Sequence, residues 1–105
     1  MILSNKVIEH FKAKERKALE LIKSYAFEFV EIGIFGSYAR NTYTAISDID
    51  ILVVSLEKPA RWIRGSIRDE LDLKGVDVHF VSLEYFNNSN DNFMNHVRKD
   101  YIRRV

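Results

Sequence analysis

The chain has 105 residues, of which 47% are hydrophobic and 30% are charged. This length predicts a single domain over residues 1–105, because domains usually contain about 50 to 250 residues, and the composition is that of a globular protein. Lys and Arg number 16 against 15 for Asp and Glu, so we expect no non-specific attraction to nucleic acid or to acidic lipid. The absence of cysteine excludes disulfides, thiolate metal sites and a cysteine nucleophile.

The amino terminus carries no targeting pattern. Charged residues recur every few positions over 1–17, which leaves no room for the apolar segment of a signal peptide. Apolar runs such as 51–54 are far shorter than the roughly 18 residues of a membrane span. We therefore expect a cytoplasmic protein without a membrane segment.

The first half of the chain predicts a long helix and two strands. Apolar residues recur at helical spacing from Ser4 to Ala26, which indicates an amphipathic helix with one buried face. Glu28 to Phe35 is rich in Phe, Val and Ile and predicts a strand, followed by a short helix or turn around Tyr38 to Tyr43. Asp48 to Val54 begins polar and continues as an unbroken apolar run, which is typical of a central strand.

The second half predicts a helix, a strand and a closing helix. Pro59 stands where a helix can begin, and apolar residues at helical spacing continue to Lys74-Gly75. Val76 to Val81 predicts a third strand. A short turn and a polar loop follow over 83–91, and a helix is expected over Phe93 to Arg104. This order predicts an α/β (α+β) fold in which helices flank a small mixed sheet.

Three aspartates predict a metal site. Asp48 and Asp50 share one face of the predicted central strand, because successive side chains alternate between the two faces. Asp77 lies near the beginning of the next strand and joins them if the two strands are neighbours. Clustered carboxylates repel one another unless a cation lies among them. Hard oxygen ligands of this kind suit magnesium or manganese.

Ten residues separate a glycine-serine pair from Asp48. Gly36 and Ser37 follow the first predicted strand directly. Glycine lets a ligand approach the backbone closely, and free N–H groups beside a hydroxyl bind phosphate. Each motif alone is usually an ordinary turn or an exposed pair, so it is their combination that predicts a nucleotide site.

The motif region, from Gly36 to Val53 with Val76-Asp77 further on, resembles the polymerase β-type nucleotidyltransferase superfamily, most closely its minimal nucleotidyltransferases. The resemblance implies a polymerase β-like fold, ATP as donor and two magnesium ions, with manganese as an alternative. On this sequence it implies that the triphosphate is held by Gly36, Ser37 and Arg40, that the metals are held by Asp48, Asp50 and Asp77, and that Asp77 also serves the acceptor hydroxyl.

Two positions leave alternatives open within this motif. The family pattern has glycine after the arginine, where this chain has Asn41. Asn is tolerated in the left-handed region, so we expect the turn to be kept. Arg40 fits a contact with phosphate or, equally, an ion pair with a nearby carboxylate.

Other polar and aromatic residues have two interpretations each. His79 shares a strand face with Asp77; we expect it to be packed, with orientation of Asp77 as the alternative. Trp62 fits either packing or a partner surface. The basic residues of 12–17 are interrupted by Glu, so they predict a solvated helix face and not an RNA-binding site.

The resemblance also implies a reaction and a partner. A nucleoside monophosphate, AMP from ATP, would be transferred to an acceptor hydroxyl, with Asp77 as general base. Minimal nucleotidyltransferases are commonly encoded with a HEPN-type RNase toxin, and some act as its antitoxin by adenylylating it.

Two alternatives belong to other classes: a non-catalytic antitoxin that neutralises its partner by contact, and a core subunit that another chain completes. The closing helix offers a surface for a partner or for oligomerisation, because we expect its stripe of Met94, Val97 and Tyr101 to be incompletely covered.

Overall fold

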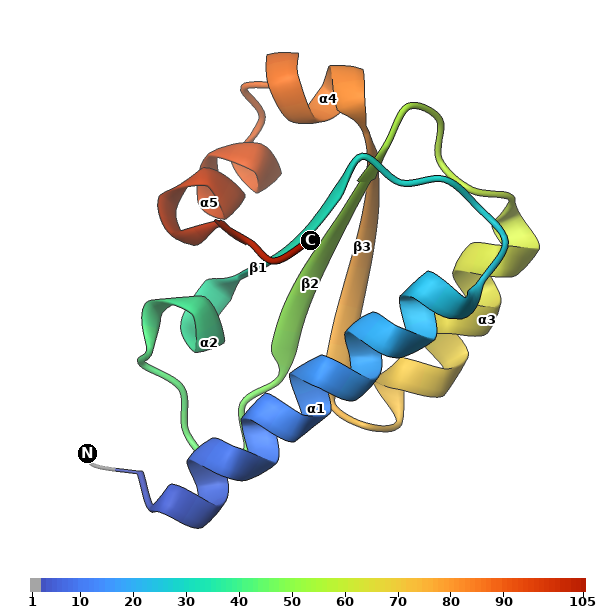
Figure 1. Cartoon of the computed structure of the whole chain (residues 1–105). Coiled ribbons are helices and arrows are strands. Elements are labelled where there is room, and N and C mark those ends of the chain that lie inside the picture. Colours follow the sequence, from blue (N-terminus) through green and yellow to red (C-terminus); the bar gives the residue numbers. More distant parts are fainter. Residues whose placement is uncertain (1–2) are drawn as a thin grey trace.

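The computed structural model describes residues 3–105, which form a four-stranded mixed sheet and five helices (Figure 1). The elements in chain order are α1 (Asn5–Ser24), β1 (Glu31–Phe35), α2 (Gly36–Arg40), β2 (Ile49–Ser55), α3 (Arg61–Asp72), β3 (Val76–Ser82), α4 (Leu83–Asn88), α5 (Asn92–Asp100) and β4 (Ile102–Arg103).

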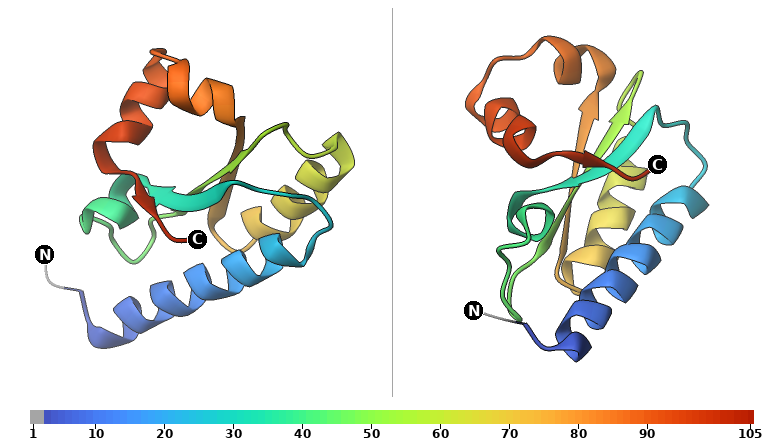
Figure 2. Two further views of the ribbon diagram at one scale, coloured as in Figure 1. Left: turned by 45° about the horizontal axis from the view of Figure 1, so that its top comes forward. Right: turned by 60° about the vertical axis from the view of Figure 1, so that its left-hand side comes forward.

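The sheet has the strand order β3-β2-β1-β4 and separates two helical layers. β2 and β3 are parallel, whereas β1 is antiparallel to both β2 and β4. Helices α1 and α3 cover one face, and α4 and α5 cover the other (Figure 2). Side chains alternate along β2, so Ile49 and Ile51 enter the core under α1 and α3, while Leu52 packs with the opposite cluster.

Helix α1 confirms the apolar stripe that the sequence predicts. The Ser4 side chain accepts a hydrogen bond from the N–H of Val7 and caps the first turn. Phe11, Ala18 and Ile22 are all buried. Burial of a large apolar side chain stabilises the fold by about 1.5–3 kcal/mol. Within residues 3–105, no helix combines the length and the apolar character that crossing a membrane requires.

Several predicted boundaries are wrong. Strand β1 begins at Glu31, three residues after the expected start. Residues 83–88 form helix α4 where a turn was expected, because the Ser82 hydroxyl accepts from the N–H of Tyr85 and caps a helical turn. The closing helix ends at Asp100, because the chain beyond it returns to β1 as strand β4.

Met94 and Val97 of α5 are covered, so the expectation of an incompletely covered stripe is wrong for these two residues, whereas Tyr101, which follows the helix, is half-buried. Met94 and Val97 are both 0% exposed. They pack with Phe35, Leu52 and Val54 on the sheet. The helix therefore contributes to the second core and does not offer these residues to a partner.

Strand β4 fits against β1 only because residue 33 is glycine. A Cβ atom on Gly33 would lie 2.6 Å from the carbonyl oxygen of Ile102 and would also collide with the ring of Tyr101. We predict that Gly33→Ala lowers the free energy of unfolding by about 1–3 kcal/mol, the usual penalty for overpacking. Urea denaturation measures this change.

Gly65 provides the matched control, because nothing lies within 4 Å of its Cβ position in α3. Gly65→Ala should raise the free energy of unfolding by about 0.4–1 kcal/mol, since it restricts the unfolded chain without a clash. Equal stabilities for the two variants would contradict the close approach of β4 to β1.

Candidate active site

The sheet brings the predicted site residues to one end. Phe35, at the end of β1, pairs with Asp50 near the start of β2, and Asp50 pairs with Asp77 near the start of β3. Gly36 follows Phe35 and begins α2. The end of β1 and the starts of β2 and β3 therefore meet at the same edge of the sheet (Figure 1), and the expectation that β2 and β3 are neighbours is confirmed.

Asp50, Asp77 and His79 form a cluster of possible ligands. One side-chain ligand atom from each lies within 4.8 Å of those of the other two. Burial raises the pKa of Asp50 above its usual range, and the negative charge of Asp77 raises it further. His79 opposes this increase, and the charge of Asp48 adds to it. The electrostatics are those of an anionic site that a cation would stabilise.

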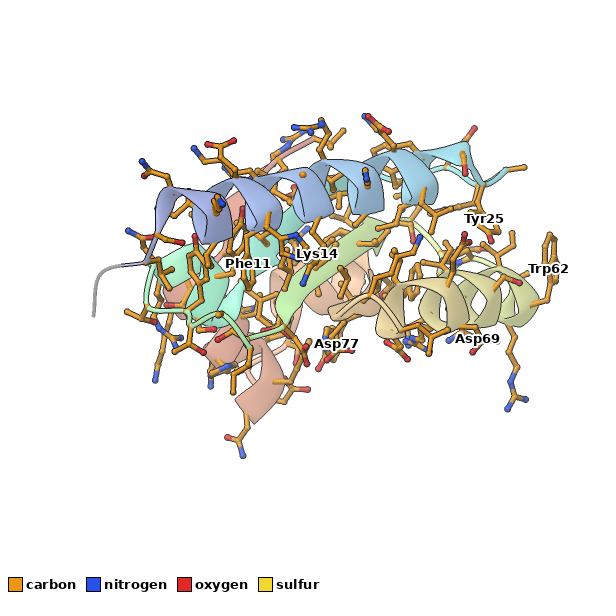
Figure 3. All side chains as sticks on the ribbon, turned by 90° about the horizontal axis from the view of Figure 1, so that it is seen from below. Phe11, Lys14, Tyr25, Trp62, Asp69 and Asp77 are labelled. Atoms are coloured by element: carbon orange, nitrogen blue, oxygen red, sulfur yellow. The ribbon has the colours of Figure 1, made fainter. Side chains whose placement is uncertain are left out.

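Asp48 lies beside this cluster and not within it. It precedes β2, is exposed, and has its Oδ1 atom 3.4 Å from the Cβ position of Gly75. The Nζ atom of Lys14 lies 3.2 Å from the same position and 4.7 Å from the centre of the Phe11 ring. The Lys14 side chain thus extends from α1 toward the start of β3 (Figure 3). The sequence had predicted that the basic residues of 12–17 form a solvated helix face, and Lys14 departs from that prediction.

Gly36 is in contact distance of the Asp50 carboxylate. Its φ of 78° is in the left-handed region, and a Cβ atom there would collide with Oδ2 of Asp50. Helix α2 then ends at Asn41, whose φ of 65° is also left-handed and whose N–H donates to carbonyls of the preceding turn. The turn is therefore kept with asparagine in place of the family's glycine, as expected.

His79 is both packed and hydrogen-bonded. Its Nε2 atom lies 3.2 Å from Oδ2 of Asp77. The imidazole lies near the rings of Phe35 and Phe93, with centroid distances of 5.4 and 5.2 Å. The two interpretations that the sequence left open are thus both correct, because packing fixes the ring that orients Asp77.

Arg40 pairs with a carboxylate. Its Nη1 atom lies 2.6 Å from Oδ2 of Asp100, and this pair joins α2 to the end of α5. The Asp100 side chain is 6% exposed and the Arg40 side chain 44% exposed, so water reaches the pair from the arginine side only. The contact of Arg40 with phosphate stays a prediction, as does that of Ser37. Trp62, near the start of α3, is 68% exposed and lies far from Asp77 (Figure 3), so it does not belong to the core.

The donor set fits a hard divalent cation. Magnesium is usually held by one or two carboxylates together with substrate phosphates. Asp50 and Asp77 would supply the carboxylates, and the backbone of Gly36 lies directly beside Asp50, where phosphate oxygens would complete the coordination.

The raised pKa of Asp50 predicts a pH effect on the metal-free protein. The folded state binds this proton more tightly than the unfolded chain does. The free energy of unfolding should therefore rise as the pH falls from neutral through the folded-state pKa of Asp50. This rise should end when the pH reaches about 4, the ordinary pKa of a carboxyl group in the unfolded chain. Asp50→Asn should remove this contribution and stabilise the metal-free protein at pH 7.

Denaturation of both proteins in chelator, from pH 8 to 4, measures the difference. Added magnesium should raise the melting temperature of the wild type and leave that of Asp50→Asn unchanged. If the free energy of unfolding changed with pH in the same way for both proteins, the surroundings of Asp50 would not disfavour its ionised form.

Comparisons with known proteins agree with this geometry. A family description, the nucleotidyltransferase domain, matches residues 15–104. A relative from Methanocaldococcus jannaschii that is named a protein adenylyltransferase is 42% identical over 77 residues, which cover 72% of this chain and 78% of the relative.

Two solved structures share the fold. A nucleotidyltransferase from Sulfolobus solfataricus matches with a TM-score of 0.65 and 25% identity, over 98% of this chain and 89% of that chain. A structure of a tri-AMPylated HEPN toxin from Shewanella oneidensis in complex with MNT antitoxin matches with a TM-score of 0.58 and 22% identity, over 88% and 69%. The family match covers most of the chain and includes every residue of the predicted site. The chain therefore belongs to the nucleotidyltransferase family and has the fold of its polymerase β-type members.

Proposed function

We propose that this chain transfers AMP from ATP to a hydroxyl group of a partner protein, and that this partner is a HEPN-type toxin. The observation that carries the proposal is the contact of the Gly36 backbone with Asp50, next to the Asp77–His79 pair. In this proposal the phosphate site at Gly36 and the acceptor carboxylate of Asp77 would lie on either side of Asp50.

The similarities support the same substrate class. The Methanocaldococcus jannaschii relative is named a protein adenylyltransferase. The Shewanella oneidensis structure contains an AMPylated HEPN toxin with its MNT antitoxin.

The residues of the site divide the reaction between them. The N–H groups of Gly36 and Ser37 would hold the triphosphate, and Asp48 and Asp50 would hold magnesium, with Asp77 as a further ligand. Bound magnesium would lower the pKa of the acceptor hydroxyl and would stabilise the leaving pyrophosphate. Asp77 accepts the hydroxyl proton as the oxygen bonds to the α-phosphorus and the bond to pyrophosphate breaks. His79 keeps the Asp77 carboxylate in place through its hydrogen bond.

A substitution of Asp77 distinguishes the catalytic hypothesis from the hypothesis that the protein neutralises its partner by contact alone. Asp77→Asn should retain ATP affinity within about 3-fold, since Asp50 remains beside Gly36. Transfer should fall by about 100-fold or more, the usual contribution of a general base. Incorporation of labelled AMP into the co-purified partner measures transfer, and calorimetry measures ATP binding.

The matched control is Asp69→Asn, which changes an exposed carboxylate on α3 outside the ligand cluster. It should leave transfer unchanged. Growth of cells that produce both proteins provides the biological readout. If Asp77→Asn protected the cells fully while transferring no label, the protein would act by contact, and the enzymatic interpretation would lose its role in protection.

A further inference from the structure

A groove of about 360 Å³ lies between helices α1 and α3. Its walls come from these two helices, which lie side by side in Figure 3, and from the turn that leads into β3. None of the residues that line it belongs to the cluster of Asp50, Asp77 and His79. The groove is therefore a second concave surface, separate from the candidate metal ligands.

The groove ends at the edge of the sheet that carries the candidate active site. Val76 lines the groove and packs in the core under α1 and α3, and the next residue is Asp77, on the other face of β3. Gly75 lies at this edge. The position of its Cβ atom is 3.2 Å from Nζ of Lys14, which lines the groove, and 3.4 Å from Oδ1 of Asp48. A chain bound in the groove can therefore continue around this edge to Asp77.

Three lysines line the groove and are not neutralised. Among residues 3–105, none of Lys14, Lys17 and Lys74 lies within 4.0 Å of a carboxylate. They share the lining with one acidic residue, Glu20. Lys17 and Lys74 are exposed, whereas Lys14 is half-buried, with its Nζ atom 4.7 Å from the centre of the Phe11 ring. Positive charge in a cleft of this kind attracts a negatively charged ligand.

The rest of the lining is apolar. Ala18, Leu71 and Val76 are buried, and Leu21 is half-buried beside them. An amphipathic segment of a protein fits both parts of the lining, because its apolar side chains pack on these residues while its carboxylates reach the lysines. A nucleic acid fits less well, because the groove has no aromatic side chain on which bases could stack. The surface therefore favours an acidic polypeptide.

We propose that the groove between α1 and α3 binds an acidic amphipathic segment of the acceptor protein and so brings the hydroxyl-bearing part of that protein to the sheet edge at Asp77. This inference rests on the proposed function, for which it names the surface that holds the acceptor. The Asp and Glu side chains of the segment pair with Lys14, Lys17 and Lys74. Docking of the acceptor is thus separate from the residues proposed to hold ATP, and the two can be measured apart.

Reversal of two groove charges tests this separation. Lys17→Glu combined with Lys74→Glu changes exposed side chains, so we expect the fold to be kept. Transfer of labelled AMP is measured with increasing concentrations of the partner that co-purifies with the chain. The concentration for half-maximal transfer should rise by about 10-fold or more, because attraction becomes repulsion, and the maximal rate should stay within about 2-fold. Calorimetry should find the same affinity for ATP as in the wild type.

Lys23→Glu is the matched control, because it reverses the charge of an exposed lysine on α1 that does not line the groove. It should change neither the half-maximal concentration nor the maximal rate. An equal half-maximal concentration in the wild type, the double variant and the control would overturn the inference and leave the proposed function intact. A wild type that binds its partner and transfers no AMP to it would instead contradict the proposed function.

Cross-linking identifies the bound segment without any transfer. The sequence contains no cysteine, so a photoreactive maleimide attached to Lys17→Cys is confined to one position. Irradiation of the complex in the absence of ATP, followed by peptide mapping, should recover one segment of the partner in which Asp and Glu recur between apolar residues. The same reagent on Lys23→Cys should not recover that segment.

Three results of these experiments would overturn the inference. The first is a cross-link from Lys17→Cys to a basic segment of the partner or to no part of it. The second is a cross-link to another copy of this chain, which would make the groove a contact between copies. The third is weaker binding of a single-stranded RNA probe by the double variant with unchanged binding of the partner, which would make the groove a nucleic-acid site.

Discussion

The repulsion between Asp50 and Asp77 is the constraint around which the molecule is organised. The positions of both carboxylates are set by the backbone, because the parallel pairing of β2 with β3 places the two residues side by side. The apolar residues that flank them, such as Ile49, Ile51 and Val78, are fully buried or nearly so, and each contributes about 1.5–3 kcal/mol. The core thus holds together two carboxylates that would otherwise separate, and a cation bound between them would recover the free energy that this proximity costs.

The end of α5 and the segment after it hold β1 and α2, the two elements that meet at Gly36, in place. Asp100 pairs with Arg40 of α2, and the Tyr101 hydroxyl donates to Glu31 at 2.7 Å. Strand β4 then pairs with β1. Three contacts therefore tie the last residues of the chain to the strand and helix that carry Gly36. The position of Gly36, where we propose that the donor triphosphate binds, therefore depends on residues that lie about sixty positions away in the sequence.

The sequence predicted the elements whose patterns are local. The helical stripe of α1 and the apolar run of β2 are repeated over many residues, so their type was clear. The alternation of side chains along β2 was also enough to predict which face of the strand carries Asp50. Asp77 could be added to it on the assumption, now confirmed, that β2 and β3 are neighbours. Strand β4 could not be predicted, since two residues have no period and their pairing depends on the missing side chain of Gly33. The position of Arg68 at the β3 edge was equally hidden, because a long flexible side chain finds its partner only in three dimensions.

The contact between Gly36 and Asp50 restricts how this protein can diverge. As long as Asp50 is present, any side chain at position 36 would collide with it. Once Asp50 is lost, the collision disappears, but the φ of 78° remains and still disfavours every residue with a Cβ atom. Glycine should therefore persist longer than aspartate in gene copies that no longer need to transfer nucleotides. A descendant that has the glycine and lacks the aspartate would have lost nucleotide transfer and would be retained because its surface still binds a partner.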